Sequence, residues 1–148
     1  MGNEVIAIAS DHAGFDLKAY IIESLSKDGY KLEDMGTYSG ASTDYPDWGH
    51  KLGRAVDRQE YQLGIAICGS GNGISMVLNK YEGVRSALCW TEEIAALARS
   101  HNDANVCTLP ARFISKEQSI KILNKFLNTS FEGGRHEARV KKIAIKNQ

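Results

Sequence analysis

The run Leu63–Cys68 constrains the fold of this chain more than any other segment. Its residues, Leu-Gly-Ile-Ala-Ile-Cys, include no charged or strongly polar side chain. A strand with one face in water alternates apolar and polar residues, whereas a strand covered on both faces is apolar throughout. The glycine-rich segment Gly69–Gly73 follows at once. We therefore expect Leu63–Cys68 to be a central strand of a parallel sheet with helices on both faces.

Strand-like and helix-like segments alternate along the rest of the sequence. Short apolar or β-branched runs predict further strands at residues 4–9, 31–35, 84–89 and 105–109. Amphipathic spacing and capping residues predict helices at residues 17–25, 46–58, 74–79, 91–101 and 116–128, with a short basic helix after residues 133–134. This order predicts a doubly wound, Rossmann-like α/β fold with a five-stranded parallel sheet. A chain of 148 residues suits one domain, which we place at residues 1–148.

The charge balance and the cysteines limit the function classes. Lys plus Arg and Asp plus Glu each number 18, so the formal net charge is zero, which argues against a nucleic-acid binder. Any bound anion must then be held by a few local cations. No apolar run approaches the roughly 20 residues of a membrane span, and the N-terminal residues lack the regions of a signal peptide. Three widely spaced cysteines form neither a disulfide framework nor a zinc pattern, so we expect a cytoplasmic protein without a metal site.

The glycine loop after the central strand is the first candidate for chemistry. Gly69, Gly71 and Gly73 let the backbone turn sharply and direct several N–H groups at one point beside a helix start, where they can hold an anion. The spacing is G-x-G-x-G, not the dinucleotide-binding G-x-G-x-x-G, and no Gly-Lys-Ser/Thr of a P-loop follows. A tight strand-to-helix turn would use the same glycines, so the pattern alone leaves both interpretations open.

Cys68 stands on the last residue of the apolar strand, directly before this loop. A free cysteine is commonly a small buried hydrophobic residue, and we adopt that interpretation for Cys89 and Cys107 inside predicted strands. At Cys68 the adjoining helix N-terminus should lower the pKa of the thiol. The resulting thiolate could act as a base or as a nucleophile.

Charged and polar side chains at other positions could bind a ligand. Parallel α/β folds bind ligands beyond the carboxyl ends of their strands, where Asp11 and His12 lie. Asp11 could cap the following helix, or the pair could bind hydroxyls and a phosphate. Arg135 and Arg139 are four residues apart, so both guanidinium groups lie on one face of a predicted helix. They form either a solvated basic tail or a phosphate grip.

His101 and Asn102 end the helix that precedes the fifth strand. Topology therefore places them at the edge of the sheet opposite Cys68. Within one subunit His101 should be unable to reach the thiol. It is either structural or serves the site of a neighbouring subunit across a dimer interface.

These segments together resemble the type B ribose-5-phosphate isomerases and the related galactose-6-phosphate and allose-6-phosphate isomerases. The resemblance covers nearly the whole chain in order. It is carried by residues 10–14 (Ser-Asp-His-Ala-Gly), 43–46 (Thr-Asp-Tyr-Pro), 68–75 (Cys-Gly-Ser-Gly-Asn-Gly-Ile-Ser), 79–80, 85, 101–105 (His-Asn-Asp-Ala-Asn), 112, 133–136 (Gly-Gly-Arg-His) and 139. Each motif alone has low specificity for the family, but the whole set in this order is highly specific.

The resemblance implies a cofactor-free and metal-free aldose–ketose isomerisation through an enediolate, in sites shared between the subunits of a homodimer or a dimer of dimers. Cys68 would be the base that moves a proton between C2 and C1, and His101, assisted by Asp11, would open the sugar ring. The oxyanion would be stabilised by N–H groups of Gly69, Gly71, Asn72 and Gly73 and by the Ser70 hydroxyl. The phosphate would be held by His12, Arg112, Arg135 and Arg139. Tyr45 and Asn102 would line the sugar pocket, and the C-terminal helix would take part in the dimer contact.

Two positions distinguish this sequence within the family it resembles. One branch has a glutamate base two residues after the last loop glycine and lacks the cysteine; here that position is Ser75 and Cys68 is present. Ser70 stands where many relatives carry threonine, which keeps the hydroxyl donor. The version with a cysteine base is therefore the better match, and ribose 5-phosphate is the expected substrate.

Other functions stay open from the sequence alone. The loop Gly36–Thr43 and residues near Trp90 could admit one more carbon, which would make a hexose 6-phosphate, allose or galactose, the substrate. A module that binds a phosphate or nucleotide without chemistry would use the same glycine loop, and it predicts that Cys68→Ala keeps all function. A dinucleotide-dependent oxidoreductase is the most distant of these alternatives.

Overall fold

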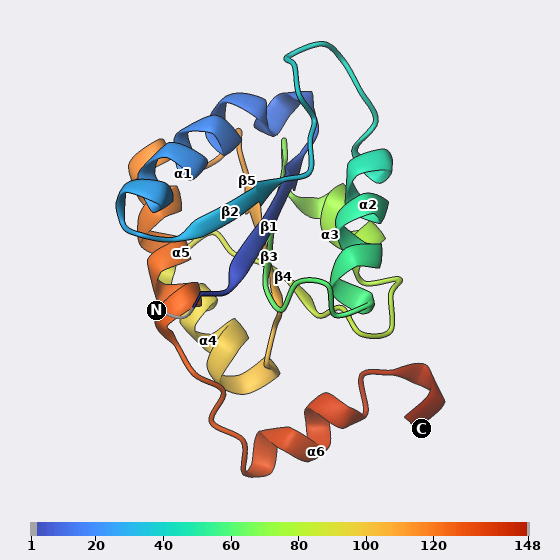
Figure 1. Cartoon of the computed structure of the whole chain (residues 1–148). Helices are drawn as coiled ribbons and strands as arrows, with labels where there is room; N and C mark the ends of the chain where they lie inside the picture. Colours follow the sequence, from blue (N-terminus) through green and yellow to red (C-terminus); the bar gives the residue numbers. More distant parts are fainter. Residues whose placement is uncertain (1–2, 148) are drawn as a thin grey trace.

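A sheet of five parallel strands forms the centre of the computed structural model, which describes residues 3–147 (Figure 1). In chain order the strands are β1 (Val5–Ser10), β2 (Lys31–Asp34), β3 (Gly64–Cys68), β4 (Ser86–Leu88) and β5 (Val106–Pro110). Their order across the sheet is β2-β1-β3-β5-β4. Every residue of β3 is buried, so the predicted central strand is confirmed. Residues 1, 2 and 148 of the predicted domain lie outside the described residues.

Helices cover both faces of the sheet, as the alternating sequence predicts. They are α1 (Phe15–Lys27), α2 (Tyr45–Asp57), α3 (Asn72–Leu78), α4 (Glu92–Asn102), α5 (Lys116–Asn128) and α6 (Arg135–Lys141), with short 3-10 turns at His12–Gly14 and Ile145–Asn147. One core cluster unites the sheet with α1, α4 and α5, and a second unites it with α2 and α3. Along β3, Ile65 and Ile67 face the first cluster, whereas Ala66 and Cys68 face the second. The strand is apolar throughout because both of its faces are core.

Side-chain caps fix several helix starts where the sequence predicts them. Thr91 Oγ1 accepts a hydrogen bond from the Ile94 N–H at 3.2 Å, and Ser115 Oγ accepts one from the Gln118 N–H at 3.0 Å. Asp11 caps the 3-10 turn that leads into α1 rather than α1 itself. The element boundaries differ from prediction by up to two residues, most clearly for β4.

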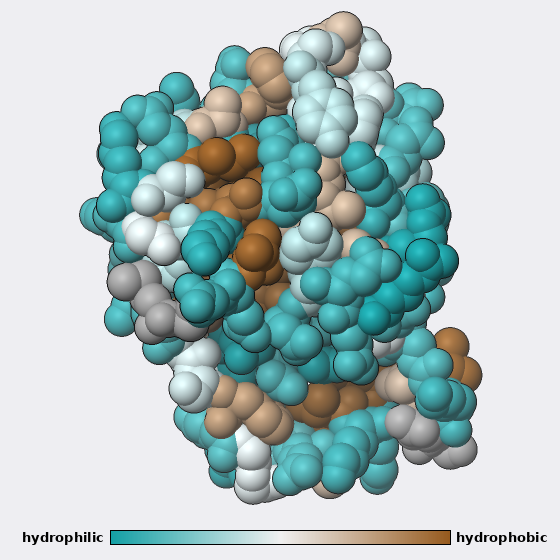
Figure 2. Space-filling view, viewed as in Figure 1, coloured by the Kyte–Doolittle hydropathy of each residue, from teal (hydrophilic) through white to brown (hydrophobic). Residues whose placement is uncertain are grey.

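The C-terminal segment, residues 129–147, stands apart from the rest of the molecule (Figure 1). It meets the body at the end of α4 and through an ion pair between Lys146 and Glu82 at 2.7 Å. A groove between this segment and the body is lined by apolar and charged side chains that include Arg85, Phe131, Val140 and Ile143. Figure 2 shows apolar surface along this groove. Among residues 3–147, no helix has the length and apolar character needed to span a membrane.

Candidate functional site

Three loops meet at the carboxyl ends of β1, β3 and β5. The Asp11 N–H donates to the Ile67 carbonyl at 3.2 Å, and the Arg112 N–H donates to the Gly69 carbonyl at 3.0 Å. The Ala111 N–H donates to the Cys68 carbonyl, also at 3.0 Å. These main-chain bonds tie the predicted site residues Asp11, Cys68 and Arg112 to one edge of the sheet. This is the edge at which parallel α/β folds bind ligands.

The glycine loop needs glycine for two separate reasons. Gly71 has φ +76°, and a Cβ there would lie 2.4 Å from Leu88 Cδ1 and 3.3 Å from the Leu109 main chain. A Cβ on Gly73 would lie 2.5 Å from the ring of Tyr45, so the ring packs directly on the backbone of the loop. The predicted tight turn is therefore present, and Tyr45 lies directly against it.

The loop also presents hydrogen-bond donors. Helix α3 begins at Asn72, and the first N–H groups of any helix lack acceptors within it. The Asn72 N–H donates to Ser70 Oγ at 3.3 Å, which holds this hydroxyl beside the start of the helix. Ser70 and Asn72 are both exposed. The arrangement can accept an oxygen anion at the mouth of the loop.

Cys68 differs from the other two cysteines in its position. Its side chain is 4% exposed and belongs to the α2/α3 side of the core, at the last residue of β3. Cys89 and Cys107 are completely buried on the opposite face, as expected for structural cysteines. Burial, helped by a hydrogen bond with Cys89, raises the pKa of the Cys107 thiol well above its usual value. Of the three thiols, Cys68 stands beside the glycine loop.

Two cationic or proton-donating groups lie at this edge. The guanidinium of Arg112 covers Gly69, since a Cβ there would be 3.0 Å from Arg112 Nη1. His12 Nδ1 lies 3.2 Å from the Thr43 main-chain nitrogen and 3.1 Å from its carbonyl oxygen, which fixes the orientation of the ring. Nε2 is the ring nitrogen that Thr43 does not engage. Arg112 and His12 can therefore receive an anionic group of a ligand, while the Tyr45 ring, 40% exposed, forms another wall.

Lys18 supports this edge and was not among the predicted site residues. Its side chain is buried, and Nζ forms an ion pair with Asp34 and donates to the Thr37 carbonyl at 2.7 Å. These contacts tie α1 to the loop that follows β2 and leads to Thr43 and Tyr45. A lysine beside an apolar residue is ordinary in an amphipathic helix, so the sequence carried no signal that this cation is buried.

The other predicted site residues lie elsewhere in the subunit. His101 and Asn102 end α4, just before β5, whereas Cys68 pairs with Pro110 at the far end of β5. Val106 and Pro110, the two ends of β5, are four residues apart, which at about 3.3 Å per residue is roughly 13 Å. Arg135 and Arg139 are exposed on α6. The structure thus places His101 at the edge opposite Cys68, as the topology predicts.

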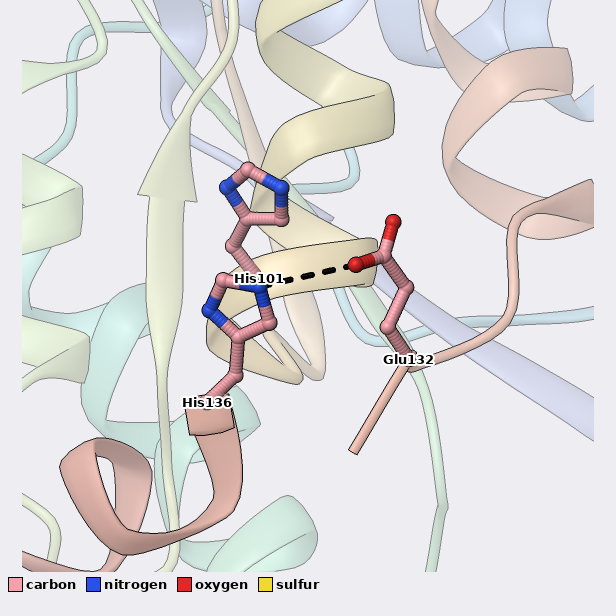
Figure 3. A group of neighbouring side chains, drawn as sticks. All are labelled: His101, Glu132 and His136. Atoms are coloured by element: carbon pink, nitrogen blue, oxygen red, sulfur yellow. Dashed lines mark ion pairs between the residues drawn. The ribbon is translucent and has the colours of Figure 1, made fainter. Parts of the chain in front are cut away.

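His101 has a partner that the sequence did not reveal. Its ring stacks on that of His136, with centroids 4.2 Å apart and 13° between the ring planes. His136 Nε2 lies 3.5 Å from Glu132 Oε2 (Figure 3). Burial, followed by the positive charges of His101 and Arg135, lowers the pKa of His136.

Comparisons with known proteins identify relatives of this chain. The family model described as ribose/galactose isomerase matches residues 6–143. The ribose-5-phosphate isomerase B of Escherichia coli is 40% identical over 143 residues, which covers 97% of this chain and 96% of that protein. A crystal structure of a ribose 5-phosphate isomerase from Thermotoga maritima is similar with a TM-score of 0.94 and 47% identity, covering 97% of this chain and 99% of the other. The Mycoplasma genitalium ribose-5-phosphate isomerase B with bound ribulose-5-phosphate has a TM-score of 0.91 and 44% identity, covering 95% and 93%.

Proposed function

The chain belongs to the ribose/galactose isomerase family, and we propose that it interconverts ribose 5-phosphate and ribulose 5-phosphate as an aldose–ketose isomerase. The observation that carries the proposal is the meeting of Cys68, the glycine loop and Arg112 at one ligand-binding edge. The relative with bound ribulose-5-phosphate, 44% identical to this chain, supports a pentose phosphate as the ligand.

Cys68 is the proposed base of the reaction. The thiolate removes the proton from C2 of the open-chain aldose, and the electrons of that C–H bond form an enediolate. The proton then returns to C1, while the hydroxyl proton of O2 is lost and O1 is protonated, which gives the ketose. A single positioned base can contribute roughly 10²- to 10⁴-fold to such a proton transfer. The position of Cys68 at the end of β3, beside the loop, supports this role.

The glycine loop is the proposed oxyanion site. Negative charge develops on the sugar oxygens in the enediolate, and N–H groups of Gly69, Gly71, Asn72 and Gly73 would stabilise it together with the Ser70 hydroxyl. Donors fixed before the charge forms are effective because they need no reorganisation, and loss of one typically costs about 10²- to 10³-fold in rate. The left-handed backbone at Gly71 supports this arrangement, since it lets the chain turn within the loop.

Phosphate binding and ring opening are proposed to use both subunits of a homodimer. His12 and Arg112 would hold the phosphate from the subunit that supplies Cys68. His101, Asn102, Arg135 and Arg139 would come from the other subunit, with His101 and Asp11 opening the ring across the interface. The separation of roughly 13 Å along β5 supports this division, because His101 cannot approach Cys68 in its own chain.

The C-terminal segment is the proposed dimer contact. It stands apart from the body, and Ile143 and Ile145 are 55% and 87% exposed. A contiguous exposed apolar patch commonly marks an interface between proteins, and both side chains border one surface pocket. Tyr45 and Asn102 would then line the sugar pocket from the two sides.

Two assays test the proposal. The purified protein should isomerise ribose 5-phosphate, and Cys68→Ala should lose activity by about 10²-fold or more while still binding ribulose 5-phosphate in calorimetry. Full activity in Cys68→Ala would refute the role of the base. The same assay with allose 6-phosphate and galactose 6-phosphate tests the substrate, since a higher kcat/KM on either hexose would overturn the pentose assignment.

A further inference from the structure

Three side chains that can bind a metal ion converge away from the glycine-loop edge. His101 ends α4, Glu132 lies in the link between α5 and α6, and His136 lies in the first turn of α6 (Figure 3). One ligand atom from each, a ring nitrogen or a carboxylate oxygen, lies within 4.8 Å of the other two. Two imidazoles and one carboxylate form a ligand set that Zn²⁺ adopts in proteins, with water in the fourth position.

The spacing of two of these ligands already suits one ion. His136 Nε2 and Glu132 Oε2 are 3.5 Å apart. Two ligands on one tetrahedral zinc ion lie about 3.4 Å apart, given metal–ligand bonds of about 2.0–2.2 Å. An ion could therefore bridge these two atoms with little movement of either residue.

His136 Nε2 is also a buried polar atom without a hydrogen bond. The residue is 6% exposed, and within residues 3–147 this nitrogen has no hydrogen-bond partner. Buried polar atoms nearly always form a hydrogen bond, and among the described residues this one has only the longer 3.5 Å contact with Glu132 Oε2, so it can take a further partner. A metal–nitrogen bond at Nε2 would supply the missing partner.

The main chain fixes the positions from which these ligands project. The Glu132 N–H donates to the Ser100 carbonyl at 3.0 Å, which ties the link to the residue next to His101. The His136 N–H donates to the Gly133 carbonyl at 3.0 Å, which forms the turn that opens α6. The three side chains are thus held together by backbone hydrogen bonds and not only by their own contacts.

His101 must move slightly to complete the site. The two rings are stacked and nearly parallel, whereas a metal ion must lie close to the plane of each ring that binds it. His101 is only partly buried and Glu132 is exposed, so the His101 ring can tilt toward the carboxylate. Arg135 and Arg139 on α6 oppose a cation. Because these positive charges weaken the binding of a metal ion at the cluster, we expect a chelator to remove the ion.

We propose that His101, Glu132 and His136 form a site for Zn²⁺ or a similar divalent transition-metal ion, and that the bound ion inhibits the isomerase by occupying the imidazole of His101. The inhibitory effect rests on the proposed function, in which His101 opens the sugar ring. A ring nitrogen bound to metal can neither accept nor donate a proton. The bound ion is therefore regulatory and takes no part in the isomerisation itself.

Calorimetry with ZnCl₂ on EDTA-treated, dialysed protein tests the site independently of activity. The wild type should bind one Zn²⁺ per chain. Loss of a residue that only hydrogen-bonds to a metal ligand typically weakens metal affinity roughly 10- to 100-fold, so Glu132→Gln, which removes a ligand, should weaken Zn²⁺ binding at least as much. Glu137→Gln is the matched control, because it removes the same charge from an exposed position on α6 that pairs with Lys141 outside the cluster. Cys68→Ala should bind Zn²⁺ normally. Absence of binding, equal binding by Glu132→Gln, or loss of binding in Cys68→Ala would overturn the site.

Activity on ribose 5-phosphate then tests the regulation. Glu132→Gln should match the metal-free wild type in activity and should need at least about tenfold more Zn²⁺ for half inhibition. Binding at the cluster without inhibition of an active enzyme would overturn the regulatory role. Binding at the cluster in a protein that does not isomerise would overturn the proposed function and leave the metal site standing.

Discussion

Replacement of Gly71 by alanine should destabilise the protein and inactivate it, whereas the same change at Gly133 should do far less. Both residues have positive φ, +76° and +67°. Alanine in this region costs about 1–2 kcal/mol at either position. The surroundings differ, however: a Cβ at Gly71 would meet Leu88 Cδ1 at 2.4 Å and the Leu109 main chain at 3.3 Å, whereas nothing lies within 4 Å of one at Gly133.

The expected difference follows from that contact. Overpacking of a well-packed site costs about 1–3 kcal/mol, so Gly71→Ala should lose roughly 2–5 kcal/mol in total and Gly133→Ala roughly 1–2 kcal/mol. Urea denaturation at one fixed protein concentration measures both values, since association would otherwise shift them. Isomerase activity of the folded Gly71→Ala protein should fall by about 10²-fold as the loop donors are displaced. Equal stability of the two variants, with full activity in Gly71→Ala, would refute the close packing of the loop and its role as an oxyanion site.

Two further predictions concern the thiols and the buried lysine. Iodoacetamide should modify Cys68 in the native protein before Cys89 or Cys107, because the latter two are completely buried and burial raises the pKa of Cys107. Mass spectrometry of the labelled peptides measures the order of modification, and faster labelling of Cys107 would contradict the prediction. Ribulose 5-phosphate should slow the labelling of Cys68. Lys18→Met should lower the free energy of unfolding by about 1–3 kcal/mol, since Asp34 and the Thr37 carbonyl lose their partner. Because these contacts hold the loop that leads to Tyr45, the variant should raise KM more than it lowers kcat. An unchanged free energy of unfolding for Lys18→Met would show that the contact is not stabilising.

Much of the fold could be predicted because local and global signals agree. The short apolar run ending at Cys68 is followed at once by a glycine-rich segment, which favours a strand covered on both faces. Thr91 and Ser115 cap helices where the sequence places them. The extent of β4 was less predictable, because side chains pair the main chain at its start. Asn105 Oδ1 accepts the Arg85 N–H and Asn79 Oδ1 accepts the Ser86 N–H, each at 2.8 Å. A pattern of apolar residues carries no record of such bonds.

The candidate site was likewise predictable in one part and unpredictable in another. The rule that ligands bind at strand ends brought Asp11, Cys68 and Arg112 together, since it depends only on strand order. The stack of His101 on His136 could not be predicted, because it depends on the path of an irregular link held by the Glu132 N–H bond to Ser100. Long-range placement of this kind is decided by tertiary contacts and leaves no periodic signal.

The division of the active site between two subunits is tested most directly by mixing two inactive variants. Cys68→Ala and His101→Ala should each be inactive alone on ribose 5-phosphate. In a two-fold symmetric dimer, equal mixing and subunit exchange would leave one intact site in each mixed dimer, so activity should recover to about a quarter of the wild type. Absence of recovery, with exchange verified by native mass spectrometry of differently tagged chains, would contradict the shared site.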